Sequence, residues 1–177
     1  MSGQVDLNNP KRFNFNLRWI PEKSDDGQIF FSWKYWATNN IGLGLDYRPK
    51  TNNATFSGTW RLFSETEQHP AIILGTSTDD FEDQITSESV YITASKKLLD
   101  WQGVSVSPYI GATYIFEFDK LRPIGGVSFR KDRYSALFLY SGTDPHMTLS
   151  YGLMDGHLVS FVLWGMELPG MAYTMRF

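Results

Sequence analysis

Three histidines are the residues best suited to acid–base chemistry in this sequence. Two of them have a nearby carboxylate and a hydroxyl further along the chain: His146 with Asp144 and Ser150, and His157 with Asp155 and Ser160; His69 is the third. A hydrolase needs base, orienting carboxylate and nucleophile within hydrogen-bond reach of one another, and this spacing does not require that. The dipeptides Asp-Pro and Asp-Gly that precede the two histidines are typical of turns. We therefore interpret both as turn neighbours and expect no enzyme.

Metal chemistry has two candidate sets of donors. The histidines show no paired ligand spacing, and the absence of cysteine excludes disulfides, thiol nucleophiles and thiolate metal sites. An acidic loop expected over 79–88 could bind calcium through Asp79, Asp80, Glu82 and Asp83. It lacks the glycine that a tight ligand loop needs, so we interpret it as a solvated loop tip. The sequence predicts neither a metal nor a cofactor.

A third set of candidate residues is polar or charged and falls on one face of predicted strands. It comprises Arg12, Asn14, Asn16, Arg18, Lys34, Asp46, Arg48, Arg61 and Glu117. Basic residues outnumber acidic ones five to two in this set. Rings of charge select ions in pores, whereas charges that pair across neighbouring strands would fill a small barrel. The sequence leaves an anion- or saccharide-permissive lumen and a plugged lumen equally open.

The elements that must position these residues are strands, because apolar and polar side chains alternate with a period of two. Segment 11–20 places Phe13, Phe15, Leu17 and Trp19 on one face and polar residues on the other. Twelve segments carry or continue this pattern: 11–20, 28–37, 40–48, 54–62, 71–78, 89–96, 104–118, 121–130, 134–142, 146–153, 157–166 and 170–177. The segment 97–103 is interpreted as a connection, and no helix is needed.

Length and composition narrow the class of protein further. A chain of 177 residues suffices for one domain, and its aromatic content, with six tryptophans, nine tyrosines and thirteen phenylalanines, excludes disorder. A net charge of -3 without a long basic run argues against a nucleic-acid partner. The longest nearly apolar stretches, 71–75 and 158–166, are far shorter than the ~20 residues of a membrane-spanning helix.

Many short alternating strands form either a soluble barrel with its apolar face inward or a membrane barrel with that face outward. Here the apolar face carries too many large aromatic rings for a closed interior of this size. Aromatic residues also gather near strand ends, as at membrane interfaces: Trp19, Tyr35, Tyr47, Trp60, Tyr114, Tyr134 and Phe177. We predict a closed antiparallel transmembrane β-barrel of about 12 strands, with 10 as the alternative, and both termini on the periplasmic side. Pro108 and Pro123 weaken this prediction locally, since proline cannot donate to a strand ladder.

The C-terminal run resembles the terminal strand that bacterial outer-membrane barrels present to their assembly machinery. Met171, Tyr173, Met175 and Phe177 share one phase, with Ala172 close to where that signal has a glycine. The segment 108–114 resembles the Pro-Tyr-x-Gly strand opening of several small outer-membrane barrels. These resemblances imply the bacterial outer membrane as the location, with the lipid bilayer and the assembly machinery as partners.

A longer pattern is similar to the YjbH-like barrels associated with exopolysaccharide export. In that family a Pro-x-x-x-x-Gly strand, an acidic loop and a Tyr-x-x-x-Ser/Ala-Lys strand recur in order, and here they fall in 69–79 and 89–98. The chain corresponds in length to only part of such a protein. The resemblance implies a role near saccharide export and assigns no functional residue.

The sequence thus predicts one barrel domain over residues 1–177, of which 1–10 form a flexible N-terminal segment. We expect a passive pore or conduit for small polar or saccharide solutes. Two alternatives remain open: a structural or assembly-partner barrel with an occluded lumen, and a soluble barrel that binds an apolar ligand.

Overall fold

The computed structural model describes residues 12–23, 27–81 and 85–177. In these ranges the chain forms thirteen strands: β1 (Phe13–Trp19), β2 (Ile29–Trp36), β3 (Ile41–Arg48), β4 (Asn53–Phe63), β5 (Ala71–Phe81), β6 (Ile85–Ser95), β7 (Leu99–Trp101), β8 (Val104–Ile115), β9 (Lys120–Lys131), β10 (Tyr134–Tyr140), β11 (Pro145–Met154), β12 (His157–Trp164) and β13 (Leu168–Arg176). No helix in this part of the chain is long and apolar enough to span a membrane.

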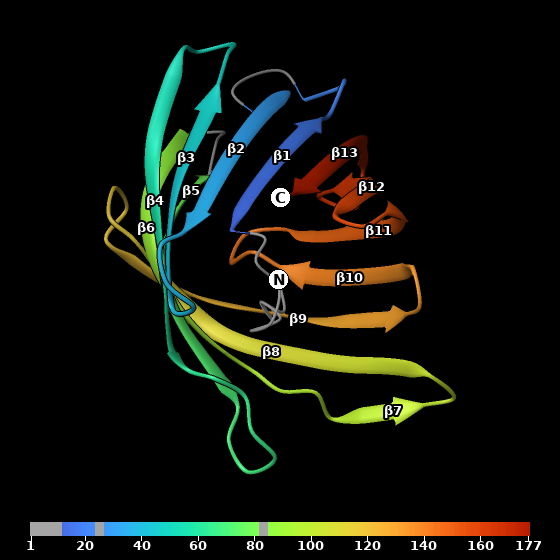
Figure 1. The fold of residues 1–177 in the computed structure, drawn as a ribbon. Coiled ribbons are helices and arrows are strands. Elements are labelled where there is room, and N and C mark those ends of the chain that lie inside the picture. The colour runs from blue at the N-terminus through green and yellow to red at the C-terminus, as the bar shows by residue number, and fades with distance from the viewer. Residues whose placement is uncertain (1–11, 24–26, 82–84) are drawn as a thin grey trace.

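Twelve of these strands close into an antiparallel barrel, which confirms the predicted fold class and strand number. Each strand pairs with its sequence neighbour, except that β6 pairs with β8 rather than β7. Pairing of β1 with β13 completes the ring, as Figure 1 shows where these two strands lie side by side. At this junction the amide of Phe13 donates to the carbonyl of Phe177 (2.8 Å), and the amide of Phe177 donates back (3.0 Å). The start of β1 and the end of β13 therefore lie at the same end of the barrel.

Two predicted boundaries were wrong, and so was the interpretation of 97–103 as a connection, because it contains the short strand β7. The acidic segment is not a loop over 79–88, because β5 continues to Phe81 and β6 begins at Ile85 in one uninterrupted ladder. Asp79 and Asp80 thus belong to a strand, while Glu82 and Asp83 lie outside the described residues. At the other long strand, β8 ends at Ile115 rather than at 118, because a turn follows in which Asp119 adopts a positive φ of 49°.

The two prolines are compatible with closure because each lies just beyond the end of the ladder on one side of its strand. Pro108 falls just beyond the ladder of β6 with β8, which ends at the pair Ser95–Tyr109. Pro123 falls beyond the ladder of β9 with β10, which begins at Gly125. A missing amide donor removes no barrel hydrogen bond on the unpaired side.

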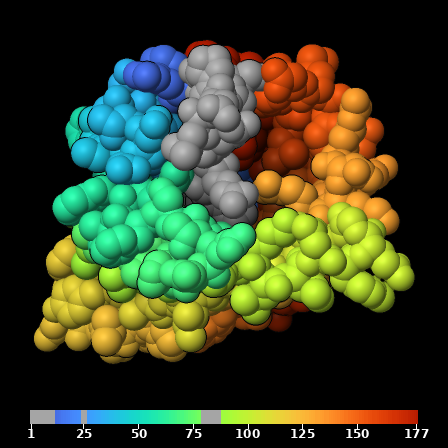
Figure 2. Space-filling model, turned by 60° about the horizontal axis from the view of Figure 1, so that its bottom comes forward, coloured from blue at the N-terminus to red at the C-terminus, as the bar shows by residue number. Residues whose placement is uncertain are grey.

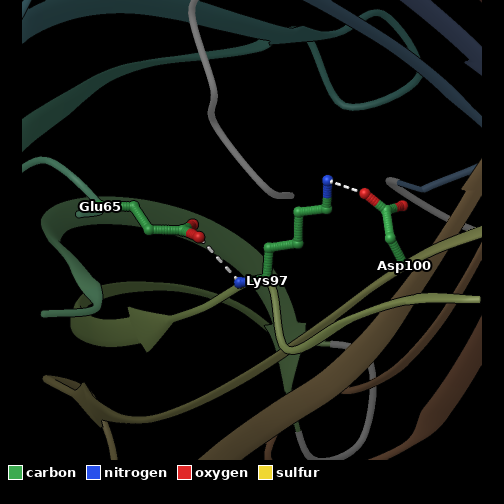
Figure 3. Close-up of polar contacts among 3 residues, drawn as sticks. All are labelled: Glu65, Lys97 and Asp100. Carbon is green, nitrogen blue, oxygen red and sulfur yellow. Dashed lines mark hydrogen bonds and ion pairs between the residues drawn. The ribbon is translucent and has the colours of Figure 1, made fainter. Parts of the chain in front are cut away.

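The strand β7 lies outside the barrel as a short hairpin with the start of β8 (Figure 1). The turn of this hairpin is Gln102–Gly103, both with positive φ (49° and 78°), as a two-residue type I′ connection requires. Its base is joined to the β4–β5 loop, and Figure 2 shows these two segments side by side. The backbone amide of Lys97 donates to Glu65 (2.9 Å), and its ammonium group pairs with Asp100 at 2.5 Å (Figure 3).

The burial of side chains is inverted relative to a water-soluble protein. Among the described residues the buried hydrophobic side chains are only Ile20, Trp36, Ile115 and Val162, whereas ten polar or charged residues are buried. Large apolar side chains instead cover the outer surface of the barrel. Examples from different strands are Leu43, Phe56, Ile92, Ile110, Leu121, Leu149, Phe161 and Met171. Large exposed apolar patches are typical of surfaces that contact a membrane or another protein.

Candidate lumen site

The inner face of the barrel follows from the register, because residues paired across neighbouring strands point to the same side. Of the residues singled out in the sequence, the register places seven on this face: Asn14, Asn16, Arg18, Lys34, Asp46, Arg48 and Arg61. Asp46, Arg48 and Arg61 are buried, at 8%, 2% and 5% exposure. The strands β1 to β4 thus bring these residues together on one wall of the interior.

The remaining two candidates lie outside the strands. Arg12 precedes β1 and is exposed, and its carbonyl accepts a hydrogen bond from the amide of Trp36 (2.9 Å). Glu117 is exposed in the turn between β8 and β9. The sequence pattern extended the alternation of β8 through this turn, where the chain reverses and the period of two ends.

Hydrogen bonds between inward polar side chains take the place of an apolar core. Four of them cross from strand to strand: Asn16 Nδ2 to Thr174 Oγ1 (2.8 Å), Lys34 Nζ to Thr59 Oγ1 (2.8 Å), Thr78 Oγ1 to Thr55 Oγ1 (2.9 Å) and the Ser150–Ser160 hydroxyl pair (2.8 Å). Such pairs satisfy buried polar groups. Hydrogen-bonded polar side chains therefore line much of the interior.

Cationic side chains stack on aromatic rings at one end of this interior. The guanidinium carbon of Arg18 lies 4.3 Å from the ring centroid of Trp164 and 4.9 Å from that of Phe30. Arg48 lies 5.1 Å from the same Phe30 ring, and Lys23 lies 4.3 Å from Trp164. Cation–π contacts gain strength when water is excluded. This cation–aromatic cluster, made of Arg18, Lys23, Phe30, Arg48 and Trp164, lies near the β1–β2 connection.

Arg48 and Trp36 hold buried donors without acceptors. The Nη2 group of Arg48 donates to the carbonyl of Thr78 (2.6 Å), but its Nε and Nη1 groups have no hydrogen-bond partner among the described residues. The same is true of the indole nitrogen of Trp36, whose ring lies 5.7 Å from both Lys34 and Arg61. Buried polar groups are nearly always paired, so these donors mark a place where the fold leaves hydrogen bonds unmade.

The sequence-level histidine pairs do not form a triad. His157 faces outward and shares a hydrogen bond with the hydroxyl of Tyr173 (2.5 Å), whereas Ser150 and Ser160 face inward. His146 is buried at 5% exposure and its ring lies 4.0 Å from that of Trp164. Its neighbour is the turn serine Ser141, at 3.3 Å.

His146 connects two turns. The amide of Gly165 donates to Nδ1 (2.9 Å), so Nδ1 carries no proton and the ring is the neutral Nε2–H tautomer, which donates to Ser141 Oγ. This arrangement joins the β10–β11 and β12–β13 turns beside Trp164. The hydrogen bonds of His146 therefore hold these two turns together next to Trp164 of the cation–aromatic cluster.

Replacing His146 with phenylalanine is expected to lower the free energy of unfolding by about 1–3 kcal/mol, because the partly buried Gly165 amide loses its acceptor. His146→Asn is the matched variant, since its side-chain oxygen can occupy the place of Nδ1, and it should lose less. Urea unfolding in detergent measures both. Equal losses in the two variants would mean that ring packing, rather than the hydrogen bond, stabilises this end.

The second half of the barrel contributes inward cations that the sequence reading did not select. Among inward strand residues whose side chains are described, eight are basic and one, Asp46, is acidic; the basic ones are Arg18, Lys34, Arg48, Arg61, Lys120, Arg122, Arg130 and Arg176. Extending the same alternation to 121–130 and 170–177 would have identified Arg122, Arg130 and Arg176, while Lys120 lies just before the first of these ranges. The interior is thus more strongly basic than the first strands alone indicated.

The C-terminal residues singled out for assembly lie on the outer face. In β13, Met171, Tyr173 and Met175 pair with Trp19, Leu17 and Phe15, all outward residues of β1. The ring of Phe177 stacks on that of Phe13 at 5.6 Å. The last strand therefore presents a continuous apolar surface at the closing seam.

Comparisons with known proteins add no further identification. No protein-family model matches the sequence, and no curated protein is significantly similar to it. Within the described part of the chain, no group of three histidine, cysteine or acidic side chains lies close enough to hold a metal ion. The inference about function therefore depends on the geometry and charge of the barrel itself.

Proposed function

We propose that this chain is an outer-membrane β-barrel whose basic interior guides small anionic or acidic solutes. The observation that carries the proposal is the contrast between the two faces, one apolar and exposed around the ring, the other polar with eight cations and one carboxylate among its described strand residues. A closed sheet satisfies all backbone groups within a bilayer. Charges lining a low-dielectric wall raise the local concentration of ions of opposite sign.

The polar interior does not favour a soluble barrel with an apolar ligand. Its described inner face consists largely of serine, threonine, asparagine, glycine and charged residues, and an apolar ligand there would leave them without partners. Outer-membrane location and recognition of the apolar β13 surface by the assembly machinery belong to the same proposal.

Planar-bilayer conductance tests the passage of ions. We expect discrete current steps with anion selectivity, and we expect Arg18→Glu combined with Arg48→Glu to lower the anion-to-cation permeability ratio by about threefold or more. Lys131→Glu is the matched control, because Lys131 pairs with Tyr134 on the outer face and should leave selectivity unchanged. Folding of each variant is checked by heat-modifiable migration on a gel.

An occluded barrel is the second candidate, and a specific observation favours it. Ile20 and Lys23, which follow β1, are buried at 0% and 6% exposure, and Lys23 reaches the ring of Trp164. Together with the cation–aromatic cluster they place buried side chains at one end of the interior. Folded protein that inserts into bilayers without any current would support this candidate over the conduit.

A further inference from the structure

The inner wall formed by β2, β3 and β4 contains buried hydrogen-bond donors that lack partners. Three of the buried nitrogen atoms without a hydrogen-bond partner, two on Arg48 and one on Trp36, come from adjacent strands, and the described buried atoms of this kind include no oxygen. Neighbouring Lys34 and Arg61 add positive charge on the same wall. The buried donors on this wall therefore lack acceptors, and the positive charge beside them favours an acceptor that is a negatively charged oxygen.

Arg48 is the best-defined point on this wall. Its side chain is 2% exposed and fixed from two sides, by the carbonyl of Thr78 at 2.6 Å and by the ring of Phe30 at 5.1 Å. Arg18 lies 4.9 Å from the same ring centroid, so the two guanidinium carbons cannot be more than about 10 Å apart. The inward carboxylate of Asp46 lies within electrostatic range of Lys34.

The chemistry of the missing partner follows from this arrangement. A cation would be repelled, and a neutral sugar hydroxyl would bring a donor together with each acceptor. An oxyanion supplies two or more acceptor oxygens and a compensating charge, and the planar fork of arginine matches its geometry. We propose that Arg48, with Arg18 beside it, forms an oxyanion-binding site inside the barrel, for a phosphate, sulfate or carboxylate group.

This inference rests on the basic interior of the proposed function but does not require that the interior be open from end to end. Titration calorimetry of the refolded full chain in detergent, at low salt, tests it with inorganic phosphate as the probe. We expect saturable binding by the wild type, weakened about tenfold or more in Arg48→Gln. Arg48→Lys should also weaken binding, because the charge is kept but the fork is lost.

Arg133→Gln is the matched control, because Arg133 is exposed in the β9–β10 turn, where Nη1 donates to the carbonyl of Leu153 (3.4 Å). It should bind phosphate as the wild type does. Glucuronate and glucose separate the sources of the oxyanion: binding of glucuronate but not of glucose would identify acidic saccharides as ligands, and binding of phosphate alone would identify a free inorganic anion.

Thermal unfolding gives a readout that does not depend on a variant folding. Phosphate should raise the unfolding midpoint of the wild type more than chloride of equal ionic strength. A wild type that binds none of phosphate, sulfate and glucuronate, or an Arg48→Gln variant with unchanged affinity, would overturn the site. Current without oxyanion binding would refute the oxyanion site but support the proposed conduit. Oxyanion binding without current would support the site but refute the conduit.

Discussion

Replacing Phe56 with arginine is expected to lower the free energy of unfolding from a lipid bilayer by about 2–4 kcal/mol. The ring of Phe56 is 86% exposed on the outer face and pairs in register with outward Leu45, away from the ends of the strands. If this face contacts lipid, a guanidinium group placed there loses its hydration on insertion. Urea unfolding from vesicles, monitored by tryptophan fluorescence, measures the difference.

Thr51→Arg is the control for this experiment, because Thr51 is exposed in the turn between β3 and β4, where water would still reach the new charge. It should change the free energy of unfolding by less than about 0.5 kcal/mol. If Phe56→Arg were neutral in vesicles and the wild type dissolved as a monomer in plain buffer, the outer face would be facing water and the membrane proposal would fail.

Replacing Gly111 with alanine is expected to open the barrel where β6 meets β8. An added Cβ at this position would lie 2.1 Å from the carbonyl oxygen of Ile92 and 2.9 Å from the Cα of Thr93. Both obstructing atoms belong to the backbone of β6, which cannot move aside without parting the ladder. We expect a loss of at least about 3 kcal/mol of stability, at or beyond the upper end for overpacked sites.

Gly58→Ala provides the matched control for the seam. The added Cβ would meet only the side-chain oxygen of Thr76, at 3.9 Å, which is an ordinary contact. This variant should keep the heat-modifiable gel band of the folded barrel, while Gly111→Ala should lose most of it. A folded, wild-type-like Gly111→Ala barrel would show that β6 and β8 are not held together as the register places them.

The alternation of side chains was sufficient to find the strands because, in most of them, the two faces meet different surroundings. In β3, for example, Ile41, Leu43 and Leu45 point outward and Gly42, Gly44 and Asp46 point inward, so the period is unmistakable. Closure into twelve strands then follows from the need to remove unpaired edges. The seven inward residues of β1 to β4 were within reach of the same argument.

The cation–aromatic cluster was less accessible to sequence reasoning, because some strands are apolar on both faces. In β12 the inward residues Leu158, Val162 and Trp164 are as apolar as the outward Phe161 and Leu163. The sequence pattern therefore does not show which side chains point inward. Phe30 on β2 is hidden in the same way beside Phe31. The unmet donors of Arg48 depend on distances between strands, which no local pattern encodes.

Acidic residues also led to a wrong prediction for the end of β5. Asp79 and Asp80 have low strand propensity and were read as the start of a loop. The ladder of β5 with β6 nevertheless continues through them to Phe81, because eleven consecutive residue pairs hold the two strands together. Cooperative pairing therefore outweighed the preference of individual residues.

The β7 hairpin takes no part in closing the barrel. All barrel pairing between β6 and β8 is made without residues 99–103, and the side chains of Leu99 and Trp101 are 53% and 63% exposed. An epitope or a small reporter peptide spliced between Gln102 and Gly103 would lengthen an appendage and leave the wall intact. The molecule thus carries its own insertion site, at the same end of the barrel as the start of β1 and the end of β13.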